Sequence, residues 1–336
     1  MSEVKTWYGI DLFKIVAAVL IVYLHTYNSD WGLIGEGIKQ VMSSAGVPFF
    51  FIVSGFLLRI GLNRNWAQGG IDRERSWFGK YILRLARMYF VWSLITFPVA
   101  IYVVNRGHPD YGIAMRILYH LRLFFLTGSL GIYWYILALI ICAFIIRCCY
   151  HRHLIGALMA VSILFFVWGC VYNSPFNNHG PLMEVIHVLF GSERNFLNMG
   201  LFYMLIGFIF PVGKDGPFHK IAPLVMLVLA ILLRCSEWRL IGTGFTIVFV
   251  AVAFFWTAVS YSYNFASRFS FEARKLSIGI YLIHFPFILA FDFYLKKGTA
   301  LDFPMALLFS IMVFYLIQMA CPSISKLLFG YGRTSC

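Results

Sequence analysis

The chain has 336 residues, of which 61% are hydrophobic and only 12% are charged. Soluble domains carry about 25% charged residues. Together with a mean hydropathy of +0.80, this composition predicts an integral membrane protein. The net charge of +13 does not indicate nucleic-acid binding, because membrane proteins concentrate Lys and Arg in cytoplasmic loops. The seven cysteines show no metal-binding spacing, so neither a metal site nor structural disulfides are expected.

The apolar stretches of the chain predict ten membrane spans, because about 20 apolar residues cross the core of a bilayer. The spans are expected near residues 9–27, 41–60, 81–104, 131–149, 154–172, 196–212, 219–233, 240–262, 276–295 and 304–322. With the N-terminus inside the cell, most Lys and Arg residues fall in the inner connections, which places both termini in the cytoplasm. The sequence thus predicts an all-α polytopic membrane protein with one membrane-embedded domain over 1–336 and no appended soluble domain.

The first predicted span carries two ionisable side chains, Lys14 and His25. Their spacing of eleven residues returns an α-helix to nearly the same face, about 16 Å further along. Asp11 precedes Lys14 by three residues and can pair with it. Ionisable groups are costly in lipid, so they usually face a protein interior, a partner or water. The alternative is that Lys14 extends to the lipid headgroups while His25 ends the helix near the opposite surface.

The ninth predicted span contains Ser277, Tyr281 and His284. Helical spacing places these three polar side chains on one face. Unpaired polar groups in an apolar environment cost several kcal/mol, so this face is expected to have partners.

Polar and aromatic residues also mark the second and fourth predicted spans. Ser54 and Gly55 form a small-residue surface that favours helix packing, although the hydroxyl could instead reach a site. Trp134 and Tyr135 open the fourth span, where aromatic residues either anchor the helix at the bilayer surface or stack on a carbohydrate.

The stretch 59–87 is the densest basic region and is expected to connect two spans on the cytoplasmic side. Arg84 and Arg87 begin the third span, and their spacing of three residues places them on one face, where they could bind phosphates. The polar loop 177–194 is a candidate lid or acceptor rim, or simply a solvated loop.

Five motifs in this order resemble the acyltransferase-3 family of bacterial membrane proteins, and the resemblance covers most of the chain. They are Lys14 with ten residues before His25, Val47–Phe51 leading to Ser54–Phe56, Arg84 with Arg87, Trp134 with Tyr135, and Ser277 with Tyr281 and His284. This chain departs from the family pattern at Ile132, where a histidine is common, and at Phe90, where a proline is common. The hydrolase-like domain that follows the membrane part in some members is not expected here.

The resemblance implies an O-acyltransferase of the bacterial cytoplasmic membrane. Such an enzyme moves an acyl group, often acetyl, from cytosolic acyl-CoA to a hydroxyl of a cell-surface or lipid-linked glycan or a small molecule. Acyl-CoA is then a co-substrate, and no tightly bound cofactor is expected. The implied catalytic pair is His25 with Lys14, and Arg84 and Arg87 would contact the CoA phosphates. The implied substrate-binding residues are Asp11, Ser54, Trp134, Tyr135, Ser277, Tyr281 and His284.

Three alternatives remain open from the sequence. The membrane portion of vancomycin-resistance serine racemases is similar, including the start Tyr8–Asp11, and is thought to handle amino-acid supply before a soluble racemase domain. A transporter of a small polar solute is the second alternative, although no internal repeat supports it. A purely structural membrane subunit is the third, but it would not need the polar faces of the first and ninth spans.

Overall fold

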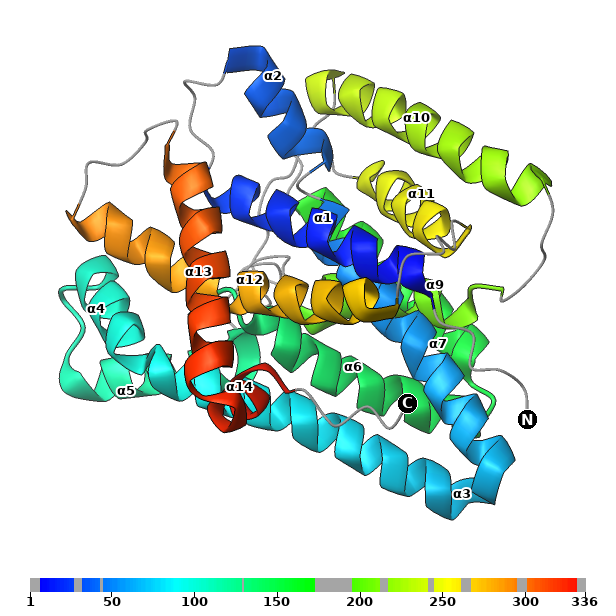
Figure 1. Cartoon of the computed structure of the whole chain (residues 1–336), viewed down its shortest axis with the longest axis horizontal. Coiled ribbons are helices and arrows are strands. Elements are labelled where there is room, and N and C mark those ends of the chain that lie inside the picture. The colour runs from blue at the N-terminus through cyan, green and yellow to red at the C-terminus, as the bar shows by residue number, and fades with distance from the viewer. Residues whose placement is uncertain are drawn as a thin grey trace. The chain divides into compact units, whose positions relative to one another are not determined.

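The computed structural model describes residues 7–26, 32–42, 45–128, 130–172, 195–211, 217–240, 245–260, 267–294 and 301–330 (Figure 1). Every regular element in these ranges is a helix, as the sequence predicts. The chain forms two compact units. Unit 1 comprises Met1–Val53 and Pro211–Pro322, and unit 2 comprises Ser54–Phe210 and Ser323–Cys336.

Unit 1 is built around α1 and α12, which pack extensively against each other. Its helices are α1 (Tyr8–Thr26), α2 (Gly32–Gly37), the π-helical turn η2 (Ile38–Met42), the start of α3 (Gly46–Ile95), α10 (Pro217–Leu240), α11 (Ile247–Ser260), α12 (Ser267–Tyr294) and α13 (Asp302–Ala320). A core cluster joins α1, α12 and α13 through Ala18, Val22, Ile280, Ile288 and Ala306.

The two central helices of unit 1 run parallel (Figure 1). Near its N-terminus α1 meets α12 at the ion pair between Asp11 and Arg274, and near its C-terminus at the ring contact between His25 and His284. This direction agrees with the predicted topology, in which the first and ninth spans cross the membrane the same way.

Unit 2 holds the rest of α3 and most of the middle of the chain. Its other helices are α4 (Phe97–Gly107), α5 (Ile113–Arg122), η4 (Leu123–Thr127), α6 (Trp134–His151), α7 (Ile155–Tyr172), η5 (Phe196–Gly200), α9 (Leu201–Ile209) and nearly all of α14 (Pro322–Phe329). At Gly55, α3 lies so close to α9 that an added Cβ would collide with the backbone carbonyl of Met204. The predicted small-residue packing surface is therefore confirmed at this position.

Helices lie at all ten predicted spans. Within the described residues, four helices are long and apolar enough to cross a bilayer, namely α1, α3, α6 and α13, and α7, α9, α10 and α11 contribute shorter apolar stretches. The membrane character of the chain follows from these helices, whereas the number of crossings and the cytoplasmic position of the termini remain predictions.

The helices differ from the predicted spans in two places. The basic stretch between the second and third spans is helical on both sides of Gly69 and Gly70, whose non-helical backbone angles divide the 50 residues of α3 into two helices. Arg and Lys are good helix formers, and Gly70 adopts a φ of 61° that favours glycine, which allows the kink. The third span is interrupted at Thr96, because Pro98 in the first turn of α4 lacks the N–H that would continue the preceding helix.

Candidate active site

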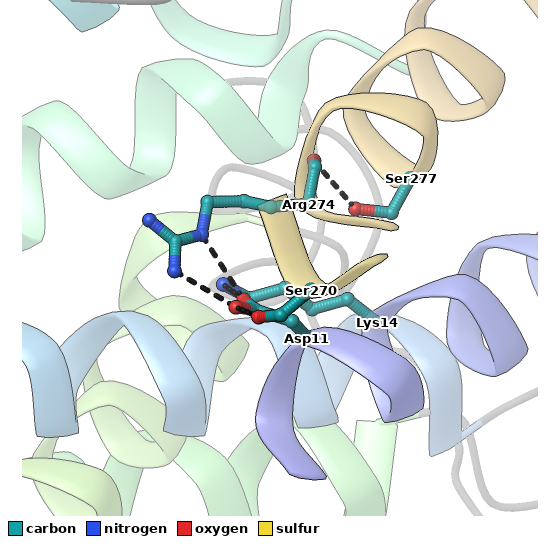
Figure 2. Close-up of polar contacts among 5 residues, drawn as sticks. All are labelled: Asp11, Lys14, Ser270, Arg274 and Ser277. Atoms are coloured by element: carbon teal, nitrogen blue, oxygen red, sulfur yellow. Dashed lines mark hydrogen bonds and ion pairs between the residues drawn. The ribbon is translucent and has the colours of Figure 1, made fainter. Parts of the chain in front are cut away.

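A buried carboxylate joins α1 to α12 in unit 1 (Figure 2). Asp11 is only 3% exposed, and Arg274 binds it through two contacts, Nη2 to Oδ2 at 2.8 Å and Nε to Oδ1 at 3.2 Å. Ser270 donates a hydrogen bond of 2.6 Å to Oδ2, and Lys14 Nζ lies 3.3 Å from Oδ1. The predicted pair of Asp11 and Lys14 is thus confirmed. We call these four residues the carboxylate cluster.

The carboxylate cluster has one more positive than negative charge, since two cations share one carboxylate. Hydrogen bonds from α1 and from α12 satisfy both oxygens of Asp11, and a buried carboxylate is stable only when it is paired and hydrogen-bonded in this way. Ser277, one turn further along α12, is fully buried and donates a hydrogen bond of 3.0 Å to the carbonyl oxygen of Arg274. The contacts of Asp11 join α1 to α12, whereas the hydrogen bond of Ser277 lies within α12. A substrate-binding role for either residue stays a prediction.

Two imidazoles meet near the other end of α1. The ring centroids of His25 and His284 lie 5.5 Å apart with an interplanar angle of 34°. Phe285 approaches His25 at 5.2 Å, and Tyr281 approaches His284 at 6.2 Å. His284 is fully buried and Tyr281 is 9% exposed, so the predicted polar face of the ninth span does point into the protein.

The histidine pair offers chemistry that the surrounding apolar core does not. A neutral imidazole can accept a proton from a hydroxyl, or attack an acyl carbon as a nucleophile. Helical spacing places His25 and Lys14 on nearly one face of α1. The structure accordingly brings the predicted residues of the first and ninth spans together within unit 1.

The remaining predicted residues lie in unit 2. The hydroxyl groups of Ser54 on α3 and Tyr135 on α6 share a hydrogen bond of 3.2 Å. Trp134, the residue before Tyr135, is also buried. Arg84 and Arg87 are both exposed on α3, as a phosphate-binding role would require. The polar loop 177–194 lies outside the described residues. Within the described residues, no group of three or more His, Cys, Asp or Glu side chains could hold a metal ion.

One polar cluster in unit 2 was not predicted. Glu74 of α3 is fully buried and forms a two-point ion pair with Arg147 of α6, at 2.7 Å and 2.9 Å. His151 Nε2 lies 3.4 Å from the same carboxylate, and the Arg147 guanidinium carbon lies 4.9 Å from the ring centre of Phe78. Glu74 lies within the basic stretch that was expected to connect two spans on the cytoplasmic side.

Ser270 and Arg274 were also missed as site residues, although the sequence contained a signal for them. Counting backwards from Ser277 by helical steps of three and seven residues gives Arg274 and Ser270, so both extend the polar face of the ninth span. The predicted span began at residue 276, and the face was therefore cut short.

Comparison with known proteins decides the family. The acyltransferase domain model matches residues 7–319. The chain belongs to the acyltransferase-3 family. This match includes both helices of the histidine pair and both helices of the carboxylate cluster, and together with the apolar helices it makes the chain a membrane acyltransferase by family.

Two curated relatives of this acyltransferase-3 protein carry another name. An amino-acid racemase of Enterococcus faecalis is 26% identical over 232 residues, which are 66% of this chain and 32% of the relative. A second amino-acid racemase of that species is 30% identical over 104 residues, which are 30% of this chain and 13% of the relative. The chain thus covers about a third or less of the length of these relatives. No solved structure matches the chain.

Proposed function

We propose that the protein transfers an acyl group from acyl-CoA, with acetyl-CoA as the first donor to test, to a hydroxyl of a glycan or small-molecule acceptor at the bacterial cytoplasmic membrane. Family membership supports the reaction class. The single observation that carries the site assignment is the contact between His25 and the buried His284, at 5.5 Å between ring centroids.

His25 is the proposed catalytic imidazole. The acceptor oxygen forms a bond to the acyl carbon, the carbon–sulfur bond of the thioester breaks, and the hydroxyl proton ends on the CoA thiolate. His25 can assist by taking that proton as a general base, or by carrying the acyl group before it passes to the acceptor. Lys14 is its proposed partner on the same helix, and Asp11 keeps the ammonium group of Lys14 in place.

Arg84 and Arg87 are proposed to bind the CoA phosphates from the cytoplasm. Both guanidinium groups are exposed and lie three residues apart on α3. Replacing both by glutamine should raise the KM for acetyl-CoA about tenfold or more, because charge-assisted hydrogen bonds to phosphate are lost. Arg75, also exposed on α3, is the matched control, and Arg75→Gln should leave this KM unchanged. An equal response of both variants would refute the assignment.

Membrane vesicles carrying the protein test the reaction itself. Vesicles supplied with radiolabelled acetyl-CoA should incorporate label into their glycan or glycolipid fraction, since native membranes provide their own acceptor. His25→Ala should reduce incorporation at least about 100-fold, the usual contribution of a catalytic proton-transfer group. His120→Ala, on α5 in unit 2, is the control and should keep wild-type incorporation. Wild-type incorporation by His25→Ala would overturn the proposal.

A second candidate function follows from the relatives named as amino-acid racemases. In that case the protein would serve as the membrane part that handles an amino acid for such an enzyme. Proteoliposomes separate the two candidates. Uptake of an amino acid without acyl-CoA would favour this second function, and CoA release that depends on a hydroxyl acceptor would favour the acyltransferase.

A further inference from the structure

The ring of His284 is fully buried and its own helix fixes its protonation pattern. Nδ1 lies 2.9 Å from the backbone carbonyl oxygen of Ile280. A carbonyl oxygen only accepts hydrogen bonds, so Nδ1 carries the ring proton and Nε2 presents a lone pair. Nε2 is buried and has no hydrogen-bond partner in the described part of the chain. A buried polar atom in this state is unfavourable, so Nε2 can gain a hydrogen bond from a donor that a ligand supplies.

The neighbours of His284 indicate which ligand would supply that donor. Its ring contacts are with His25, Tyr281 and Phe285, at 5.5 Å, 6.2 Å and 6.3 Å between centroids. A group bound to His25 would therefore lie beside the ring of His284. The lone pair of a neutral imidazole attracts an O–H or N–H donor and offers nothing to a carbonyl or a phosphate.

We propose that the two histidines divide the reaction, with His25 carrying the acyl group and His284 Nε2 acting as the general base for the acceptor hydroxyl. This inference rests on the proposed function, and it selects one of the two routes described for His25. The ligand class that fits Nε2 is accordingly an acceptor with a free hydroxyl group.

The proposed reaction has two steps. A ring nitrogen of neutral His25 attacks the thioester carbon, the carbon–sulfur bond breaks, and an acyl-imidazolium forms while CoA leaves as a thiolate. The acceptor oxygen then attacks the acyl carbon as its proton passes to His284 Nε2. The carbon–nitrogen bond breaks, its electron pair returns to His25, and the proton on His284 neutralises the CoA thiolate.

Isotope exchange separates the two steps, because the first step needs no acceptor. Purified protein incubated with acetyl-CoA and radiolabelled CoA should form labelled acetyl-CoA. His284→Asn keeps an amide donor near the position of Nδ1, so it can preserve the bond to the Ile280 carbonyl while removing the base. We expect this variant to retain exchange but to lose transfer to the acceptor in membrane vesicles by about 100-fold or more. His25→Ala should lose both reactions.

His284→Gln provides a second test, since its amide oxygen can occupy the Nε2 position and accept a hydrogen bond but cannot take up the proton at neutral pH. It should also retain exchange and lose transfer, and thermal unfolding identifies any variant that fails to fold. His120→Asn is the matched control and should keep both reactions.

Three results would overturn the proposal while leaving the proposed function intact. They are absence of exchange in the wild-type protein, equal loss of both reactions in the folded His284 variants, and wild-type transfer by His284→Asn. Retention of both reactions by His25→Ala would instead refute the proposed function itself.

Discussion

Arg274→Gln should destabilise unit 1 by about 2 kcal/mol. The substitution removes two charge-assisted hydrogen bonds to Asp11, at 2.8 Å and 3.2 Å. Such bonds contribute about 1.5–3 kcal/mol each. The Arg274 side chain is 43% exposed, so solvent screening reduces this contribution. Lys14 and Ser270 also continue to bind the carboxylate, which is therefore not left unpaired.

Asp11→Asn should cost more, about 3 kcal/mol, because it removes the buried carboxylate that Arg274, Lys14 and Ser270 all bind. The double variant should cost less than the sum of the single variants, since the contact between Asp11 and Arg274 can be lost only once. A coupling free energy of about 1–2 kcal/mol is expected for groups in direct contact.

Reversible unfolding in mixed micelles, followed by tryptophan fluorescence, gives these free energies of unfolding. Lys275 is the matched control, because it is the next residue on α12 and pairs with Glu272 on its own helix. Lys275 Nζ also lies 4.0 Å from the ring centre of Phe271, again on its own helix, so the cost of Lys275→Gln should be additive with that of Asp11→Asn within about 0.5 kcal/mol. Additivity of Asp11→Asn with Arg274→Gln within about 0.5 kcal/mol would refute the reasoning, because it would mean that the two groups do not act on each other.

Two further predictions concern unit 2. Gly55→Ala should abolish folding or lower the free energy of unfolding by several kcal/mol, because the new Cβ would collide with the backbone carbonyl of Met204. Gly79 also lies on α3, beyond the kink, and a Cβ there meets nothing within 4 Å, so Gly79→Ala should be neutral or stabilising. Comparable unfolding temperatures for these two variants would contradict this packing. Glu74→Gln should lower the free energy of unfolding by about 3 kcal/mol, because it leaves Arg147 of α6 without its buried carboxylate. Asp72 is exposed on α3, so Asp72→Asn should lower it by less than about 0.5 kcal/mol. Equal costs for the two acidic residues would show that the buried pair contributes no more than a surface charge.

The sequence predicted the helical architecture because the apolar segments of a membrane protein are long and distinct. It also predicted which faces of the first and ninth spans carry polar groups, since helical spacing alone relates Lys14 to His25 and Ser277 to His284. The pairing of these two helices was not predictable in the same way. Contacts between segments more than 200 residues apart depend on tertiary packing, which periodicity within a single helix does not report.

Hydropathy placed the ends of the predicted spans, and the helices extend beyond some of them. Charged residues set the end of the second predicted span at 60 and the start of the ninth at 276. Helical structure nevertheless extends into the basic stretch on both sides of Gly69 and Gly70, and α12 begins at Ser267. Helix formation depends on backbone propensity and tertiary contacts rather than on lipid solubility, and Arg and Lys have high helix propensity. The partners Glu74 and Arg274 lie in those polar extensions and were therefore not recognised.

The carboxylate cluster and the histidine pair are two ends of one helix contact, and this connects stability to the proposed reaction. Asp11 and His25 are fourteen residues apart, about 21 Å along α1. A slip of α1 by one residue would shift it by about 1.5 Å and turn its face by about 100°, which would remove His25 from His284. Because Arg274 and Ser270 bind Asp11 from the facing helix at 2.8 Å and 2.6 Å, the carboxylate cluster opposes such a slip. Loss of Asp11 should therefore slow acyl transfer although Asp11 contacts neither histidine. The double variant costs less stability than the sum of the single variants, but it should not recover the rate, since it restores neither bond that sets the register.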